Sequence, residues 1–309
     1  MTIPYFNIKT TRAIFLDDQK LFLDSLEMLL GDDIKMKTTI DQDVFLSEVD
    51  HILDLKSVLF KPLEVDNDCE KAIAVDLTDL CSRVFAFAET KPFSVAFIDY
   101  HMPRANGLEV CAHIKNSALK KVLFTGELDA NGGIEALNAG IVQGYIKKSQ
   151  DNLEDTVDSL FNKLNADYLK DINACMGDVF AQDQDILSVY DDPVFKSVYS
   201  DLYNQNDVVS ACIYDQYGSQ IIRFETYDLL LNVYPVREIK EVILPIIDGE
   251  AAQDYADKIE GGYILDYKKF GSLDIPPIME WNHYMTNKIK VLENGTHIVT
   301  ISTLSDHLF

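Results

Sequence analysis

The sequence lacks the patterns that identify secreted, zinc-binding or membrane-spanning proteins. Its five cysteines are odd in number and widely spaced, and no two of them form a CxxC pair. This pattern indicates neither a disulfide framework nor a zinc site. No apolar run approaches the roughly 18 residues of a membrane span, and the N-terminus lacks a basic region followed by an apolar core. We therefore expect a protein of the reducing cytoplasm that does not insert into a membrane.

Basic residues are also scarce. The 309 residues include 27 Lys and Arg against 51 Asp and Glu, a net charge of −24, and residues 151–309 alone carry −17. A domain that binds a DNA duplex needs a basic face to neutralise the phosphates. The acidic second half therefore argues against DNA binding by that half.

What the sequence does contain is a repeated unit of a short apolar strand followed by a helix. The chain is 47% hydrophobic and long enough for about two domains. Strands that alternate with helices predict an α/β domain with a parallel sheet covered on both faces. The expected strands are 13–16, about 33–40, 95–99, 122–125 and 143–146, and the main expected helices are 20–30, 41–55, 107–115, 133–138 and one that begins near 152.

Polar residues gather where these strands end. The stretch VAFIDYHMP ends a buried run on Asp99, which alone could be a metal ligand, a nucleophile or the polar end of a strand. Asp17 and Asp18 alone could cap a helix, and Thr125 alone could simply end a strand. In parallel sheets, however, chemistry takes place beyond the carboxyl ends of the strands, where these residues and Lys148 converge. That convergence favours a functional site.

The convergent residues suit phosphoryl transfer. Three carboxylates held together repel one another unless a cation joins them, and oxygen ligands of this kind suit Mg²⁺. A lysine and a hydroxyl group opposite them would serve an incoming phosphoryl group. The residues therefore predict Mg²⁺-dependent transfer of a phosphoryl group to the carboxylate of Asp99.

Four motifs in this order resemble the receiver domain of bacterial two-component response regulators: LDD at 16–18, FIDYHMP at 97–103, LFTGE at 123–127 and GYIKKS at 144–149. The resemblance implies a flavodoxin-like, doubly wound, five-stranded parallel sheet. It implies that Asp99 is the phosphoacceptor, and that a sensor histidine kinase or a histidine phosphotransfer protein is the donor. The implied roles of the other residues are Mg²⁺ binding by Asp17, Asp18 and the backbone carbonyl of His101, phosphoryl binding and switching by Thr125, Gly126, Tyr145 and Lys148, and tuning of dephosphorylation by His101 and Glu127.

The sequence departs from the family pattern in two places. The chain between Asp18 and Asp99 is longer than one strand and one helix require, which we interpret as an insertion at about residues 50–90. Ser149 replaces the proline that commonly follows the lysine of the family. Lys147 could also take the lysine role, but the spacing from Tyr145 favours Lys148. We expect the receiver domain to cover residues 1–165.

Residues 166–309 predict an acidic α+β output domain with an antiparallel sheet. Apolar residues spaced every three or four positions predict a long helix over about 153–180 that joins the two domains. A packed face within the chain is the commoner explanation of such a stripe, and a homodimer seam is the alternative.

The function of the output domain is less specified. Binding of a protein or small ligand is our first hypothesis, an enzyme acting on nucleotides is the second, and an unusual DNA-binding regulator is the third. The stretches TGELDANGGIEALNAGIVQGYIKK and SVYDDPVFKSVY also resemble the Legionella quorum-sensing response regulators. We expect a signalling protein that accepts a phosphoryl group rather than an enzyme.

Overall fold

The computed structural model describes most of the chain as two compact units. The described residues are 3–31, 34–50, 52–53, 61–62, 73–74, 76–126, 130–180, 183–238, 263–265, 285–287, 290–293 and 295–303. One unit comprises residues 8–56 and 86–175, and the other comprises residues 1–7, 57–85 and 176–309. Among the described helices, none is both long enough and apolar enough to cross a bilayer.

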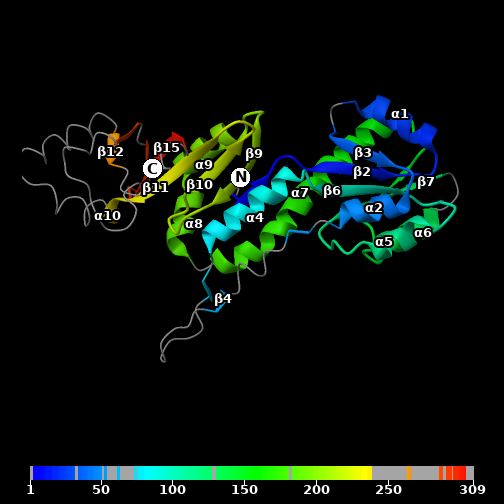
Figure 1. The fold of residues 1–309 in the computed structure, drawn as a ribbon, viewed down its shortest axis with the longest axis horizontal. Coiled ribbons are helices and arrows are strands. Elements are labelled where there is room, and N and C mark those ends of the chain that lie inside the picture. Colours follow the sequence, from blue (N-terminus) through cyan, green and yellow to red (C-terminus); the bar gives the residue numbers. More distant parts are fainter. Residues whose placement is uncertain are drawn as a thin grey trace, which may run out of the picture. The chain divides into compact units, whose positions relative to one another are not determined.

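The unit that contains Asp99 is built on a five-stranded sheet in the order β3-β2-β6-β7-β8 (Figure 1). Every neighbouring pair in this sheet is parallel. The order, with β6 in the centre, is that of a flavodoxin-like doubly wound sheet. The predicted fold of the first domain is therefore confirmed. The strands are β2 Arg12–Leu16, β3 Met36–Thr39, β6 Phe93–Asp99, β7 Lys120–Thr125 and β8 Gly144–Lys147.

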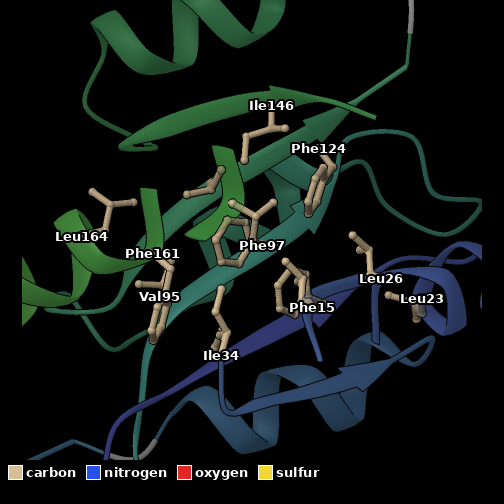
Figure 2. Packing of buried hydrophobic residues seen from close by; sticks show 14 residues of the cluster. Phe15, Leu23, Leu26, Ile34, Val95, Phe97, Phe124, Ile146, Phe161 and Leu164 are labelled. Atoms are coloured by element: carbon tan, nitrogen blue, oxygen red, sulfur yellow. The ribbon is translucent and has the colours of Figure 1, made fainter. Parts of the chain in front are cut away.

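Helices cover both faces of this sheet, which explains the continuous apolar strands. All seven residues of β6 are buried. On one face, α1 Lys20–Leu30 and α7 Leu153–Phe180 contribute Leu26 and Phe161 to a core with Phe97 (Figure 2). On the other face, α2 Gln42–Val49, α5 Gly107–His113 and α6 Ala130–Asn138 pack against Ile98. Burial on both faces makes near-continuous apolar strands, as expected for a parallel sheet.

Phenylalanine rings fill the core directly beneath the carboxyl ends of the strands. The rings of Phe15 and Phe97 stack with centroids 4.6 Å apart, and the Phe124 ring lies 5.7 Å from that of Phe97 (Figure 2). Each of these residues lies one or two positions before a polar residue at the end of its strand. The stack therefore gives the polar strand ends a rigid, closely packed base.

The second unit contains a six-stranded sheet in the order β1-β9-β10-β11-β15-β14. The pairs from β9 through β14 are antiparallel, so the predicted antiparallel sheet is confirmed. Helices α8 and α9 contribute apolar residues to the core, and Asp192 caps α9 by accepting from the backbone N–H of Val194 at 2.8 Å. The elements are β1 Phe6–Ile8, β9 Val208–Ile213, β10 Gln220–Phe224, β11 Asp228–Pro235, β14 Lys290–Val291, β15 His297–Thr303, α8 Gln184–Asp191 and α9 Pro193–Tyr203.

The insertion before Asp99 is described only in part. It contains a two-stranded antiparallel sheet, β4 Lys61–Pro62 with β5 Ile73–Ala74, and the helix α4 Leu77–Glu89. Two further strands, β12 Tyr263–Leu265 and β13 Met285–Asn287, pair with each other, and a single helical turn, α10 Val236–Glu238, follows β11.

The two units divide the chain differently from the expected boundary at residue 165. The first seven residues and residues 57–85 belong to the unit of the six-stranded sheet, and the division within α7 falls after residue 175. Hydrogen bonds account for this: the backbone N–H of Ile213 donates to the carbonyl of Tyr5 at 2.7 Å. In addition, the thiol of Cys81 on α4 donates to the carbonyl of Ile213 at 3.1 Å.

Candidate functional site

Asp17 and Asp18 follow β2 and precede α1. The parallel register places Leu16 beside Ile98, which brings the residues after both strands to the same edge of the sheet. The Asp17 side chain is buried, and its Oδ1 accepts a hydrogen bond from the backbone N–H of Gln19 at 2.9 Å. Asp18 is exposed. The tight turn between strand and helix thus presents one buried and one exposed carboxylate.

Asp99 ends the central strand of the sheet and is only 2% exposed. Its Oδ1 lies 2.8 Å from the Nζ of Lys148. Its Oδ2 is buried and has no hydrogen-bond partner in the described part of the chain. A buried carboxylate oxygen without a partner costs free energy unless a bound group satisfies it. The orphaned Oδ2 is therefore the atom at which a ligand or a reaction is expected.

Lys148 connects the two buried carboxylates. It directly follows β8, and its backbone N–H donates to the carbonyl of Thr125 at 3.0 Å. Its Nζ lies 2.6 Å from Asp17 Oδ2 as well as 2.8 Å from Asp99 Oδ1. Burial alone would lower the pKa of Lys148, but the contacts with Asp17 and Asp99 outweigh it and raise this pKa. The lysine therefore stays protonated in the site.

The charges of the site call for a further cation. Carboxylate oxygens of Asp17, Asp18 and Asp99 lie within 4.8 Å of one another. Burial, together with the charge of Asp99, raises the pKa of Asp17 despite the opposing contact with Lys148. One ammonium group cannot neutralise three carboxylates, and oxygen donors at this spacing suit Mg²⁺. The residues present therefore fit the metal ion that the sequence predicts.

Thr125 and Gly126 lie at the end of β7, the neighbour of β6 in the sheet. Thr125 is 1% exposed and is in register with Lys147 of β8. Gly126 is exposed, and a Cβ atom added to it would meet no other atom within 4 Å. The chain thus leaves open space at Gly126, next to the buried threonine. Glu127 lies outside the described residues.

His101 and Tyr145 are the remaining predicted site residues that the structure describes. His101 is exposed, and its ring meets that of Tyr100 edge-on at 4.8 Å. Tyr145 is half-buried on β8 and lines an open cavity of about 610 Å³ together with Leu137 of α6 and Leu160 of α7. The structure thus places Tyr145 beside α6, where a change of its side-chain rotamer would alter this surface.

Sequence reasoning missed two residues that shape the site. Gly107 begins α5, and a Cβ atom there would lie 2.4 Å from the backbone oxygen of Asp99. Its one signal in the sequence is Asn106 with Glu109, the spacing of a capping box, which the structure forms. Phe22, on α1, lies over the ammonium group of Lys148. Nothing in the sequence sets Phe22 apart from the other apolar residues of its helix.

Residues 57–158 match a family model described as the response regulator receiver domain. This match includes Asp99, Thr125 and Lys148, whereas Asp17 and Asp18 precede it and join the site through the fold. No curated protein sequence matches the chain.

One of the similar solved structures covers nearly the whole chain. The Legionella pneumophila response regulator LqsR is 20% identical, with a TM-score of 0.65 over 97% of this chain and 89% of that chain. A response regulator receiver domain protein from Clostridium thermocellum is 16% identical, with a TM-score of 0.33 over 50% of this chain and 94% of that one. A Thermotoga maritima response regulator in complex with Mg²⁺ and BeF is 16% identical, with a TM-score of 0.31 over 50% of this chain and 98% of that one. The likeness to LqsR shows that the fold of both units is shared.

Proposed function

We propose that the protein is a response regulator that accepts a phosphoryl group on Asp99 in a Mg²⁺-dependent reaction, an assignment supported by the match of residues 57–158 to the receiver-domain model. The observation that supports the proposal most strongly is the orphaned Oδ2 of Asp99, buried among two further carboxylates and the ammonium group of Lys148. The proposed donor is a sensor histidine kinase or a histidine phosphotransfer protein in the cytoplasm.

In the proposed reaction, Asp99 Oδ2 attacks the phosphorus atom of a phosphohistidine. A bond forms between Oδ2 and phosphorus, the nitrogen–phosphorus bond breaks, and the leaving imidazole takes up a proton. Lys148 is already 2.8 Å from the other oxygen of Asp99, where its charge would stabilise the transferring group. The Thr125 hydroxyl, at the end of the adjacent strand, would bind a phosphoryl oxygen. The open space at Gly126 would admit the donor.

Mg²⁺ would be held by Asp17, Asp18, Asp99 and the backbone carbonyl of His101. When bound, it would neutralise the carboxylates and the incoming phosphoryl oxygens. Glu127 and the side chain of His101 would tune the loss of the phosphoryl group. We further propose that the acidic second unit binds a protein or a small ligand, since its charge argues against DNA.

Phosphorylation in vitro tests the assignment of Asp99. The full-length protein incubated with acetyl phosphate and Mg²⁺ should gain one phosphoryl group in intact-mass spectra, because Asp99 Oδ2 is available as the nucleophile. Asp99→Asn should gain none, and Asp18→Ala should weaken Mg²⁺ binding and slow the reaction. Asp41→Ala is the matched control, because Asp41 caps α2 by accepting from Asp43 N–H at 2.8 Å. Equal phosphorylation of Asp99→Asn and the wild type would show that another residue is the acceptor.

A further inference from the structure

Phe22 lies over the ammonium group of Lys148, which contacts both buried carboxylates. It is the third residue of α1 and is half-buried. The Nζ of Lys148 is 4.7 Å from the centroid of its ring. This is within the roughly 6 Å at which an aromatic face attracts a cation. The contact joins a helix to the residue after β8, and these two elements lie at opposite ends of the domain sequence.

The phenylalanine stack beneath the strands holds the Phe22 ring in place. The rings of Phe22 and Phe124 meet edge-on at 81°, with centroids 5.6 Å apart. Phe124 in turn packs against Phe97 and Phe15, whose rings are in the core of the sheet (Figure 2). Edge-to-face and stacked contacts of this kind fix the orientation of each ring. Phe22 therefore presents its face to Lys148 from a rigid support.

The ring supplies a contact that the carboxylates cannot supply. The ammonium group of Lys148 contacts both Asp17 and Asp99. In a phosphorylated site it would also bind phosphoryl oxygens. The ring face attracts the ammonium group through its quadrupole, without adding negative charge to a site that already holds three carboxylates. The side chain of Lys148 is only 16% exposed, so screening by water weakens the attraction between the ring and the ammonium group only a little.

We propose that Phe22 is a positioning residue for phosphoryl transfer, whose ring face keeps the ammonium group of Lys148 beside Asp99. This inference rests on the proposed function, because the transfer itself is the reaction that Phe22 would assist. Phe22 forms and breaks no bond in the reaction. Its effect is to hold the lysine where the charge of the transferring group develops.

Fluorination of Phe22 separates the electrostatics of the ring from its shape. In Phe22→pentafluorophenylalanine the ring keeps nearly the same size, but its face no longer attracts a cation. We expect this variant and Phe22→Leu to be phosphorylated by acetyl phosphate about 3- to 30-fold more slowly. Phe22→Tyr and Phe22→Trp should restore the rate to within about twofold, since both keep a cation-binding face.

Two controls make the rate measurement specific. Met28→Ala changes the same helix at an 87% exposed side chain and should leave the rate unchanged. The affinity for Mg²⁺, measured by titration with the metal alone, should be unchanged in every Phe22 variant, because Phe22 has no oxygen to offer the metal. A wild-type rate in the pentafluorophenylalanine variant would overturn the proposal. A parallel loss of Mg²⁺ affinity would also overturn it, because it would show that the whole site had been disturbed.

A spectroscopic readout tests the contact without any phosphodonor. The ring face of Phe22 should shift the Hε protons of Lys148 upfield in the NMR spectrum of the full chain, and Phe22→Leu should abolish the shift. Absence of the shift in the wild type would overturn the inference, whatever the phosphorylation assay shows. Presence of the shift in a wild type that accepts no phosphoryl group would instead refute the proposed function, and with it the role of Phe22 in transfer.

Discussion

At the scale of single residues, the site depends on how closely the chain packs around Asp99. A Cβ atom on residue 107 would lie 2.4 Å from the backbone oxygen of Asp99 and 3.0 Å from the side chain of Leu123. The backbone N–H of Gly107 also donates to the carbonyl of Tyr100 at 2.9 Å. Only glycine therefore lets α5 begin this close to the end of β6.

Replacement of Gly107 by alanine should damage both stability and function. We expect Gly107→Ala to lower the free energy of unfolding by about 1–3 kcal/mol, because the added methyl group overpacks the end of β6. It should also slow phosphorylation by shifting Asp99. Gly126→Ala is the control for stability, since its Cβ atom meets nothing within 4 Å. Urea unfolding of the two variants measures this, and equal midpoints would contradict the packing that the structure describes.

The sequence predicted the polar residues of the site but not the residues that support them. Asp17, Asp18, Asp99, Thr125 and Lys148 could be found because each follows an apolar strand, and parallel strands bring their carboxyl ends to one edge. Gly107 and Phe22 could not be assigned a role in this way. A glycine that avoids a backbone clash and a ring that covers an ammonium group are properties of the packed structure, which strand and helix periodicity does not specify.

At the scale of elements, one carboxylate joins α9 to the β14–β15 hairpin. Oδ1 of Asp192 caps the helix, and its Oδ2 accepts from the backbone N–H of Glu293 at 2.9 Å. His297, the first residue of β15, is buried nearby, and its Nδ1 lies 2.8 Å from the hydroxyl of Thr296. Burial lowers the pKa of His297, while the charges of Asp185 and Asp192 partly oppose this effect. The hairpin is therefore sensitive to protonation of this histidine.

Stability of the second unit should fall in mild acid. Because the pKa of His297 lies below 6.5 in the folded protein, the unfolded chain binds the proton more readily. The stabilising contribution is thus complete above pH 6.5 and declines as the pH falls through 6.5 to the folded pKa. Thermal unfolding of His297→Gln should show a smaller loss of midpoint between neutral and mildly acidic pH than the wild type.

His113→Gln is the matched control for this pH dependence. His113 is exposed on α5 in the other unit, so its substitution should leave the pH dependence of the second unit unchanged. The same loss of midpoint in His297→Gln and in the wild type would show that other groups cause it.

Element types were predictable where the pattern was long and periodic, and less so in the insertion. The apolar patterns of β2, β6 and β7 and of the long helix α7 are clear, and the structure has these elements close to the expected bounds. The region interpreted as an insertion at about 50–90 contains the helix α4 Leu77–Glu89, and the short strand β1 was not expected. A three-residue strand owes its conformation to its neighbours in the sheet, so local sequence carries little signal for it.

At the scale of the whole molecule, α7 is the element that belongs to both units. Its first part packs against the parallel sheet through Val157, Phe161 and Leu164, and residues from 176 onward belong to the unit of the six-stranded sheet. The buried Lys120 of β7 forms an ion pair with Asp171, which holds the helix against the first unit as far as that residue. A conformational change near β7 and β8 could therefore be transmitted along α7, which is one continuous helix.

Occupation of Asp99 should change the dynamics of this part of the chain. With Mg²⁺ and beryllofluoride as a phosphoryl mimic, Thr125 should move toward the mimic, and hydrogen exchange or self-association involving residues 129–180 should change. Thr125→Ala should suppress the change, and Thr38→Ala on the opposite edge strand β3 should not. Identical exchange and an unchanged mass distribution with and without the mimic would exclude this route.

The assignment of the two units was the part of the fold that the sequence could not provide. Residues 1–7 are separated from residues 176–309 by the whole of the other unit, and residues 57–85 are separated from them by residues 86–175, yet all three segments belong to one unit. Such long-range pairing depends on which apolar surfaces meet in three dimensions, and a single sequence does not encode that in any local pattern.

The most direct measurement is chemical trapping of the acyl phosphate. Borohydride reduces an aspartyl phosphate to homoserine, which peptide mass spectrometry places at a single residue. After incubation of the full chain with acetyl phosphate and Mg²⁺, we predict homoserine at position 99, and none there when Mg²⁺ is chelated or when Lys148 is replaced by methionine. Homoserine at another aspartate, or none at position 99 in a protein that has gained a phosphoryl group, would contradict the assignment of Asp99 as the phosphoacceptor.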